Sequence, residues 1–161
     1  MIVIGIDPGK NSGIAIWNYG LTKALKCPGS IPEMASVVSD CIGSWKSTEH
    51  IIAYVERVHA FPTDGRSSAF KFGQNYGQWL GILAAFNIKT VLVTPQMWMK
   101  YYKEKYKIKL PKDKRQRKNK LKELAKKYTD KKVTLYNADA ILIAVYGFIE
   151  QSKEREHQHA K

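Results

Sequence analysis

The sequence predicts an α/β domain in which helices flank a mixed β-sheet. Short β-branched, apolar runs alternate with longer amphipathic segments. The expected order is three strands, a helix, a strand, a helix, a strand, a basic region and a final helix. At 161 residues the chain has the size of one domain with a single core. We therefore expect one domain over residues 1–150 and a polar, flexible tail over residues 151–161.

The first strands are expected to form a hairpin and its continuation. Two apolar runs, residues 2–6 and 13–17, are separated by the turn-forming sequence DPGKNS. This hairpin places Asp7 at the end of its first strand. A third strand is expected near residues 21–27.

The middle of the chain carries helix and strand signals in turn. Ser30 to Glu33 has the pattern of a capping box with an early proline, and apolar residues at helical spacing follow it. The apolar runs 51–55 and 90–93 have the length of buried strands, and the first of them ends in Glu56. We expect both to be central strands.

A helix around residues 69–86 carries glycines at intervals of four, namely Gly73, Gly77 and Gly81. Each glycine costs about 1 kcal/mol relative to alanine in a helix, so a close contact should offset roughly 3 kcal/mol. The smooth ridge packs either against the protein's own sheet or against a helix of a second subunit.

The positive charge is concentrated in one segment. Residues 100–132 hold 16 Lys or Arg against four acidic residues, which accounts for nearly all of the net charge of +13. Such a segment favours a polyanion partner, because neutralising phosphates releases counterions. Tyr101, Tyr102 and Tyr106 interleave with the lysines and are candidates for stacking on bases or sugars. The alternative is a solvated helix face.

Other features indicate an intracellular, cytoplasmic protein without a membrane partner. The longest apolar stretches are far shorter than a membrane span, and the N-terminus lacks the pattern of a secretory signal. Cys27 and Cys41 have no metal-ligand spacing, so buried thiols are expected.

Three acidic residues interrupt apolar surroundings: Asp7, Glu56 and Asp139. Each alone has a structural explanation, as a turn residue, a rim charge and an anion near a helix N-terminus. Parallel neighbouring strands would place Asp7 beside Glu56, and the last helix could lay Asp139 across them. Such a cluster needs a cation, and oxygen ligands suit hard divalent ions. With a polyanion partner, this predicts two-metal phosphodiester hydrolysis. Of the four histidines, only His59 lies near the expected site in sequence.

Four segments occur in the order and at the separations of the motifs of a known family: GIDPG, YVERV, SAFKFGQNYGQWLGILAA and NADAILIA. They resemble the first strand, the strand of the second carboxylate, the central helix and the final helix of the RuvC-type Holliday junction resolvases. These enzymes belong to the ribonuclease H-like superfamily. The resemblance covers the chain from Met1 to about Phe148 and leaves a cellular, phage or viral source open.

The resemblance implies a ribonuclease H-like fold and a homodimer that cuts four-way DNA junctions by paired symmetric nicks. It implies that Asp7, Glu56 and Asp139 hold Mg²⁺ or Mn²⁺, two ions per site, with Asp7 bridging both. It also places the glycine ridge at the dimer interface. The protein would act at DNA inside the cell, or inside the host cell for a phage or viral source.

The sequence departs from the family pattern at Tyr136, where a fourth acidic residue is usual. Asn137 either caps the helix or supplies an amide oxygen ligand, and Asp130 and His59 are more distant candidates. The family's basic position matches Lys118, and the resemblance places it near the scissile phosphate or the junction arms. Three further residues would support it in binding DNA, namely Lys114, Arg115 and Arg117. An aromatic residue of the loop after Glu56, His59 or Phe61, would enter the junction, or else anchor the loop.

Three other functions compete with junction resolution. Asp7, Gly9 and Gly13 loosely resemble the phosphate loop of actin-like or acetate-kinase-like phosphotransferases, although the chain is too short for their two lobes. A related nuclease would cut flaps, forks or RNA–DNA hybrids. A junction-binding module without catalysis would follow if the missing fourth carboxylate prevents metal binding.

Overall fold

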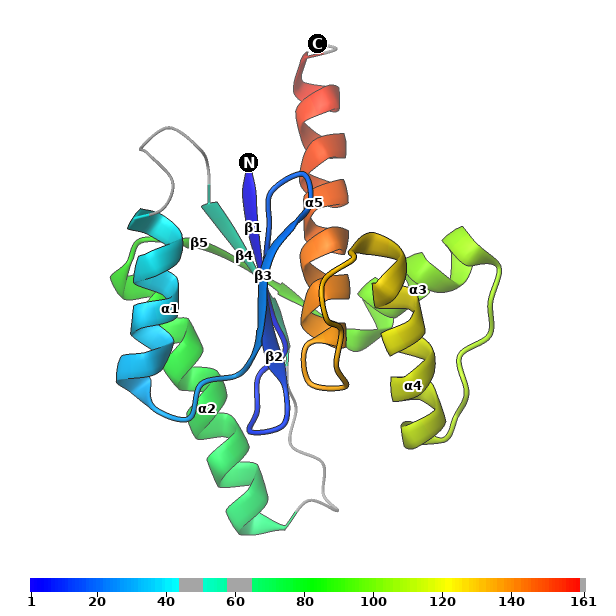
Figure 1. Cartoon of the computed structure of the whole chain (residues 1–161). Helices are drawn as coiled ribbons and strands as arrows, with labels where there is room; N and C mark the ends of the chain where they lie inside the picture. The colour runs from blue at the N-terminus through cyan, green and yellow to red at the C-terminus, as the bar shows by residue number, and fades with distance from the viewer. Residues whose placement is uncertain (44–50, 58–64, 160–161) are drawn as a thin grey trace.

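A computed structural model describes residues 1–43, 51–57 and 65–159 of the chain (Figure 1). The strands form one mixed sheet in the order β3-β2-β1-β4-β5, in which β2 is antiparallel to both of its neighbours and β4 is parallel to β1 and β5. Their bounds are β1 Ile2–Ile6, β2 Gly13–Trp17, β3 Leu21–Lys26, β4 Ile51–Glu56 and β5 Lys89–Val93. The predicted mixed sheet is confirmed.

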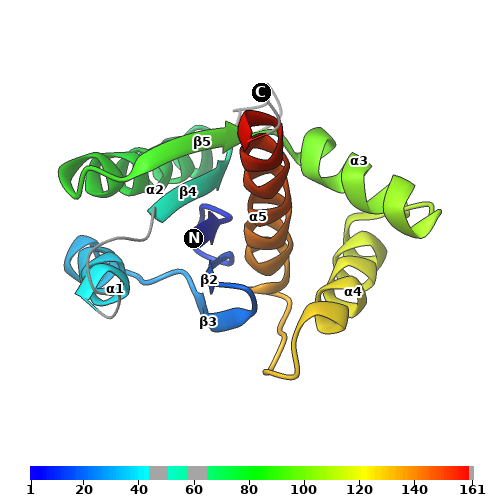
Figure 2. The same ribbon diagram turned by 90° about the horizontal axis from the view of Figure 1, so that it is seen from above.

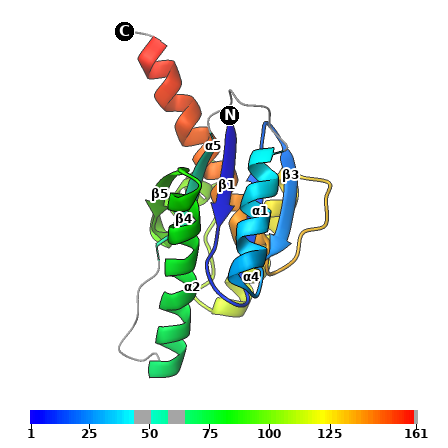
Figure 3. The ribbon, with the colours of Figure 1, turned by 90° about the vertical axis from the view of Figure 1, so that its left-hand side faces the viewer.

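Helices cover both faces of this sheet (Figures 2 and 3). One face is covered by α1 and α2, and the other by α5, with α3 and α4 packed outside α5. The bounds are α1 Ile31–Gly43, α2 Arg66–Ala85, α3 Pro95–Tyr106, α4 Lys114–Ala125 and α5 Ala138–His159, with a short 3₁₀ helix η1 at Lys126–Tyr128. In place of the single expected core, buried side chains form two clusters, one on each face, because central strands alternate their side chains between faces.

The structure confirms two local predictions, the capping box at Ser30 and Glu33 and the buried thiols. Ser30 and Glu33 form the predicted capping box, since Ser30 N–H donates to Glu33 Oε2 at 3.2 Å and Glu33 N–H donates to Ser30 Oγ at 3.4 Å. Cys27 and Cys41 are buried free thiols, as expected. No helix of the described residues combines the length and hydropathy needed to cross a membrane.

The basic region contains two helices that the sequence analysis did not resolve, α3 and α4. Tyr102 does not face a ligand as expected, because it is fully buried and its hydroxyl donates to the Leu142 carbonyl at 2.7 Å. Tyr101 and Tyr106 are half-buried beside it. The stacking interpretation is therefore wrong for Tyr102, which anchors α3 against α5.

The expected C-terminal tail is instead the end of α5, which stays helical to His159. Gln151 is buried, and its amide donates to Tyr54 Oη at 3.1 Å and to Glu154 Oε2 at 2.8 Å. An ion pair between Lys153 and Glu150, one turn apart, supports the same helix. The polar C-terminal part of α5 is therefore held to the sheet by the contact between Gln151 and Tyr54.

The glycine ridge of α2 does not pack on the sheet. A Cβ added at Gly73, Gly77 or Gly81 would meet no heavy atom within 4 Å. The opposite side of α2, with Trp79 and Leu83, is buried against the sheet. The interpretation of the ridge as a contact with the protein's own sheet is therefore wrong.

A different glycine, Gly5 in β1, sets the position of α5. A Cβ at this residue would clash with the backbone of α5, at the Ala140 carbonyl and the Ala144 amide. The absence of a side chain lets α5 lie directly on the central strand, and this close approach brings Asp139 to the end of β1.

We expect Gly5→Ala to lower the free energy of unfolding by about 3 kcal/mol, because backbone atoms on both sides must move apart. Denaturant unfolding measures the loss. Gly43→Ala is the control, since a Cβ there meets nothing within 4 Å. Equal stability of the two variants would contradict the close approach of α5 to β1.

Candidate active site

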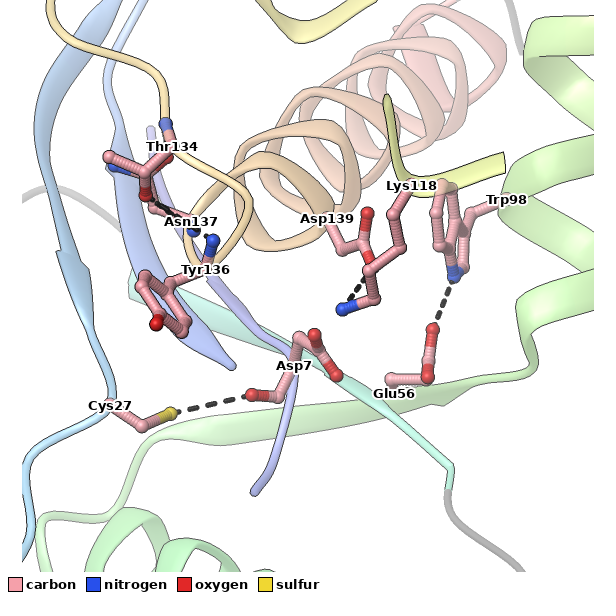
Figure 4. Close-up of polar contacts among 9 residues, drawn as sticks. All are labelled: Asp7, Cys27, Glu56, Trp98, Lys118, Thr134, Tyr136, Asn137 and Asp139. Carbon is pink, nitrogen blue, oxygen red and sulfur yellow. Dashed lines mark hydrogen bonds and ion pairs between the residues drawn. The ribbon is translucent and has the colours of Figure 1, made fainter. Parts of the chain in front are cut away.

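Three acidic side chains meet at one edge of the sheet (Figure 4). Parallel β1 and β4 pair Ile6 with Val55, so Asp7 and Glu56 follow at neighbouring positions. Asp139 lies in the first turn of α5, which crosses the ends of both strands. The structure thus brings the three predicted carboxylates together from three separate elements.

Burial and mutual repulsion disfavour the charged forms of these groups. Asp7 and Asp139 are each only 7% exposed. Burial raises the pKa of Asp7 well above its usual value, and the charges of Glu56 and Asp139 raise it further. Burial likewise raises the pKa of Glu56 to about 7, and that of Asp139 is raised mainly by burial, opposed by Lys118. Ionisation of all three carboxyl groups is therefore unfavourable unless a cation lies beside them.

Two donors partly compensate this charge. Lys118 Nζ lies 3.5 Å from Asp139 Oδ2, and the indole N–H of Trp98 donates to Glu56 Oε2 at 2.8 Å. Among the described residues, the Lys118 ammonium forms the ion pair with this cluster, and it compensates only part of the negative charge of three ionised carboxylates. Trp98 was missed by the sequence analysis, although Thr94 as N-cap and Pro95 at the first helical turn signal the start of α3.

The turn after Asp7 is held by backbone and side-chain contacts. Asp7 N–H donates to the Gly13 carbonyl at 3.0 Å, and Cys27 Sγ–H donates to the Asp7 carbonyl at 3.4 Å. Gly9 has a φ of 129°, and its N–H donates to Asn75 Oδ1 of α2 at 2.8 Å. Asn75, which the sequence analysis did not single out, therefore ties α2 to the loop that positions Asp7.

The donor set suits a hard divalent cation, because it consists of carboxylate oxygens, those of Asp7 and Asp139 buried and those of Glu56 partly buried. In the described part of the chain, no three Asp, Glu, His or Cys side chains are arranged to hold one metal ion. The contacts of Asp139 with Lys118 and of Glu56 with Trp98 occupy oxygens that such an ion would use.

The candidates for a fourth metal ligand differ in their contacts and in their exposure to solvent. Asn137 Oδ1 accepts the Thr134 N–H at 2.7 Å, and its Nδ2 donates to the Lys132 carbonyl at 3.3 Å, so both amide atoms hold the loop before α5. Asp130 is exposed in the segment between η1 and α5. Tyr136 is 42% exposed, with Lys26 Nζ 4.7 Å from its ring centroid. His59 lies outside the described residues, as does Phe61.

The predicted DNA-binding residues of the basic segment lie on α4. Lys114 and Arg115 are exposed on its first turn. Arg117 donates from Nη1 to the carbonyls of Lys112 at 2.8 Å and Pro111 at 3.3 Å, which fixes the entry to the helix. Lys118 alone of the four reaches the carboxylates.

No protein-family model matches the chain, and no curated protein matches its sequence. Its structure is similar to that of RuvC from T. thermophilus in complex with Holliday junction substrate, with a TM-score of 0.64 and 15% identity, over 94% of this chain and 96% of that one. A second Thermus thermophilus RuvC structure gives a TM-score of 0.61 and 16% identity, over 95% of this chain and 97% of that one. Fowlpox virus resolvase in complex with Holliday junction DNA gives a TM-score of 0.48 and 14% identity, over 92% of this chain and 99% of that one. The chain therefore has the ribonuclease H-like fold of RuvC.

Proposed function

We propose that the protein is a structure-selective endonuclease that resolves four-way DNA junctions by paired symmetric nicks. The observation that carries this proposal is the meeting of Asp7, Glu56 and Asp139 at the sheet edge, next to Lys118 of a strongly basic helix. Acids that are largely buried lower the stability of the folded state, so a binding or catalytic role explains their presence.

Asp7, Glu56 and Asp139 would hold Mg²⁺ or Mn²⁺, with Asp139 exchanging its contact with Lys118 for the ion. Bound divalent ions supply charge stabilisation for the attacking and leaving oxygens of an in-line phosphoryl displacement. Trp98 keeps Glu56 oriented at the end of β4, and Lys118, whose side chain is 30% exposed, is free to turn toward a phosphate. The pairing of β1 with β4 holds Asp7 beside Glu56.

The basic segment, residues 100–132, gives this site a surface for DNA. Lys114, Arg115, Arg117 and Lys118 lie on α4, which packs against α5, and Lys118 contacts Asp139 of α5. Phosphates bound there would lead a strand toward the carboxylates. The protein would act at DNA inside its cell or its host cell.

The choice of a four-way junction is supported by the fold and by the exposed ridge of α2. A similar fold is that of T. thermophilus RuvC in complex with Holliday junction substrate. Symmetric nicks need two sites related by a two-fold axis, and Gly73, Gly77 and Gly81 offer a smooth, open helix face for a second copy of the chain. We therefore propose a homodimer joined through α2.

Gly77→Leu should prevent this dimerisation while raising the stability of the separate monomer. The leucine enters open space in one protomer and favours the helix by about 1 kcal/mol, but it keeps the partner helix away. Sedimentation or light scattering should show the mass halved, with unchanged circular dichroism. Gly43→Leu, at another open glycine, is the control and should leave the mass unchanged. A Gly77→Leu protein that stayed dimeric would place the interface elsewhere.

A second candidate, a junction-binding module without catalysis, is favoured by one observation. Tyr136 occupies the position where the resemblance predicts a fourth acidic residue, and the Asn137 amide is engaged with Thr134 and Lys132. Among the described residues, the site then offers three carboxylates to a cation.

A fixed four-way junction, labelled in turn on each strand, tests both candidates. Metal-dependent cuts at symmetric positions in opposing strands are the expected result, measured across Mg²⁺ and Mn²⁺ concentrations. Tight binding without cuts in either metal would favour the binding module. Equal cutting of linear duplex would exclude a resolvase, and preferred cutting of flaps, forks or RNA–DNA hybrids would identify a related nuclease.

A further inference from the structure

An exposed aromatic residue stands beside the carboxylates without a part in the proposed chemistry. Figure 4 shows the Tyr136 ring on one side of Asp7, with Glu56 and Lys118 on the other. Tyr136 is 42% exposed, and the ammonium of exposed Lys26 lies 4.7 Å from its ring centroid. The ammonium lies over the ring as a cation–π pair, and both an aromatic ring and a cation are groups that bind nucleotides.

The sheet register fixes where this pair lies. Lys26 pairs with Gly13, the Gly13 carbonyl accepts the Asp7 N–H, and Glu56 follows on the other side of Asp7. Lys26 is thus two strands from Asp7, or about 10 Å at the usual strand spacing. The pair lies within reach of a nucleotide next to a phosphate at Asp7.

Tyr136 is held in place by the segment that starts α5. Its N–H donates to Thr134 Oγ1 at 3.3 Å, and buried Asn137 closes the same segment through the Thr134 N–H at 2.7 Å. A Cβ on Gly13 would meet the Tyr136 carbonyl at 2.6 Å, so the backbone of this segment lies against β2. The ring therefore projects from a fixed backbone, which lowers the entropy lost on binding.

A cation on the β3 side of the carboxylates would help the site to bind DNA. The three carboxylates repel a DNA strand, and Lys118 compensates them from the side of α4. Lys26 supplies positive charge from the side of β3, so a strand crossing Asp7 would have an ammonium group on either side.

We propose that Lys26 and Tyr136 form a subsite for the nucleotide next to the scissile phosphate, with Lys26 contacting its phosphate and Tyr136 packing against its sugar or base. This inference rests on the proposed function, because it needs a DNA strand at Asp7. It assigns the two residues a role in substrate positioning.

The test couples a protein change to a DNA change. Junctions carrying a single neutral methylphosphonate at successive positions are bound to the wild type and to Lys26→Gln, with Ca²⁺ in place of the metals that support cleavage. We expect Lys26→Gln to weaken binding of the normal junction and to lower its salt slope by about one. At one position next to the cut, the neutral junction should bind both proteins equally.

Tyr136→Ala should weaken junction binding about tenfold, as expected for the loss of one aromatic stack, and Tyr136→Phe should restore it. Lys23→Gln on the same strand and Tyr19→Ala, 76% exposed in the β2–β3 turn, are the matched controls and should bind like the wild type. Thermal unfolding of the Lys26 and Tyr136 variants should stay close to that of the wild type, which separates a contact with DNA from a structural role, whereas Tyr19→Ala loses the edge contact of its ring with Phe148 and serves as a control for binding alone.

The outcomes distinguish this inference from the function on which it rests. A wild type that binds and cuts junctions, while Lys26→Gln and Tyr136→Ala match their controls, overturns the subsite alone. The same holds if no methylphosphonate position removes the effect of Lys26→Gln. A wild type that does not bind the junction overturns both proposals.

Discussion

Asp7→Asn should abolish junction cleavage, with a loss of at least about 10³-fold, while junction binding is retained or improved. The change removes a central acid of the cluster and keeps the shape of the side chain. It also removes a charge that repels phosphate, and this explains why binding should not fall. Single-turnover cleavage in Mg²⁺ and Mn²⁺ and electrophoretic binding in Ca²⁺ measure the two effects.

The same variant should be more stable than the wild type in the absence of metal. The raised pKa of Asp7 and of Glu56 means that their charged forms destabilise the folded state. For Glu56, with a pKa raised from 4.5 to about 7, stability is lost as the pH rises through that interval. At pH 8 in chelator, Asp7→Asn should therefore melt at a higher temperature than the wild type. Asp113→Asn, at the exposed N-cap of α4, is the control for a change of charge alone and should not melt higher.

A lower melting temperature for Asp7→Asn in chelator would contradict the repulsion between Asp7 and the other two carboxylates. Loss of junction binding on Asp7→Asn would count against a strand passing over this residue. Full cleavage by the variant would remove Asp7 from the active site and with it the proposed function.

Replacing Lys114, Arg115, Arg117 and Lys118 together by glutamine should lower junction affinity by at least about 100-fold at low salt. Each lost phosphate contact lowers the slope of log K against log salt by about one, so the slope should fall by about two to four. Binding titrations from low to moderate salt measure both quantities. The physical reason is that these cations release the counterions of the DNA backbone.

Two smaller variants sharpen this result. Lys114→Gln with Arg115→Gln changes only exposed side chains, whereas Arg117 also holds the carbonyls of Pro111 and Lys112. Lys23→Gln with Lys89→Gln changes two exposed residues outside α4. It removes as much charge as the Lys114 and Arg115 double variant and is its control. An unchanged salt slope in the fourfold variant, or an equal fall in the control, would exclude α4 as the DNA-binding element.

The inner strands β1, β2 and β4 were predictable because they are buried, whereas the run 90–93, expected as a central strand, forms the edge strand β5. The expected runs 2–6 and 13–17 coincide with β1 and β2, and the strand ending at Glu56 was placed correctly. Side chains that must enter the core have to be apolar, so their pattern survives in the sequence. The capping box of α1 was readable for a similar reason, because its two side chains satisfy backbone groups close in the chain.

The helices α3 and α4 were not predictable from the same kind of pattern. Their exposed faces are rich in lysine, and few apolar residues mark the side that packs, so the composition of residues 100–132 concealed them. The end of α5 was missed for a related reason, since Gln151 anchors it through a polar contact with Tyr54. Polar contacts between distant residues leave no periodic signal.

The sequence by itself determined most of the strands, the three acids and the basic segment, because burial, turn chemistry and charge are local properties of residues. Only the tertiary structure decided which faces meet. It placed the glycine ridge of α2 in the open, buried Tyr102, engaged Glu56 with Trp98 and brought Lys26 and Tyr136 beside Asp7. Each of these depends on residues far apart in the chain, whose approach is set by strand order and helix packing.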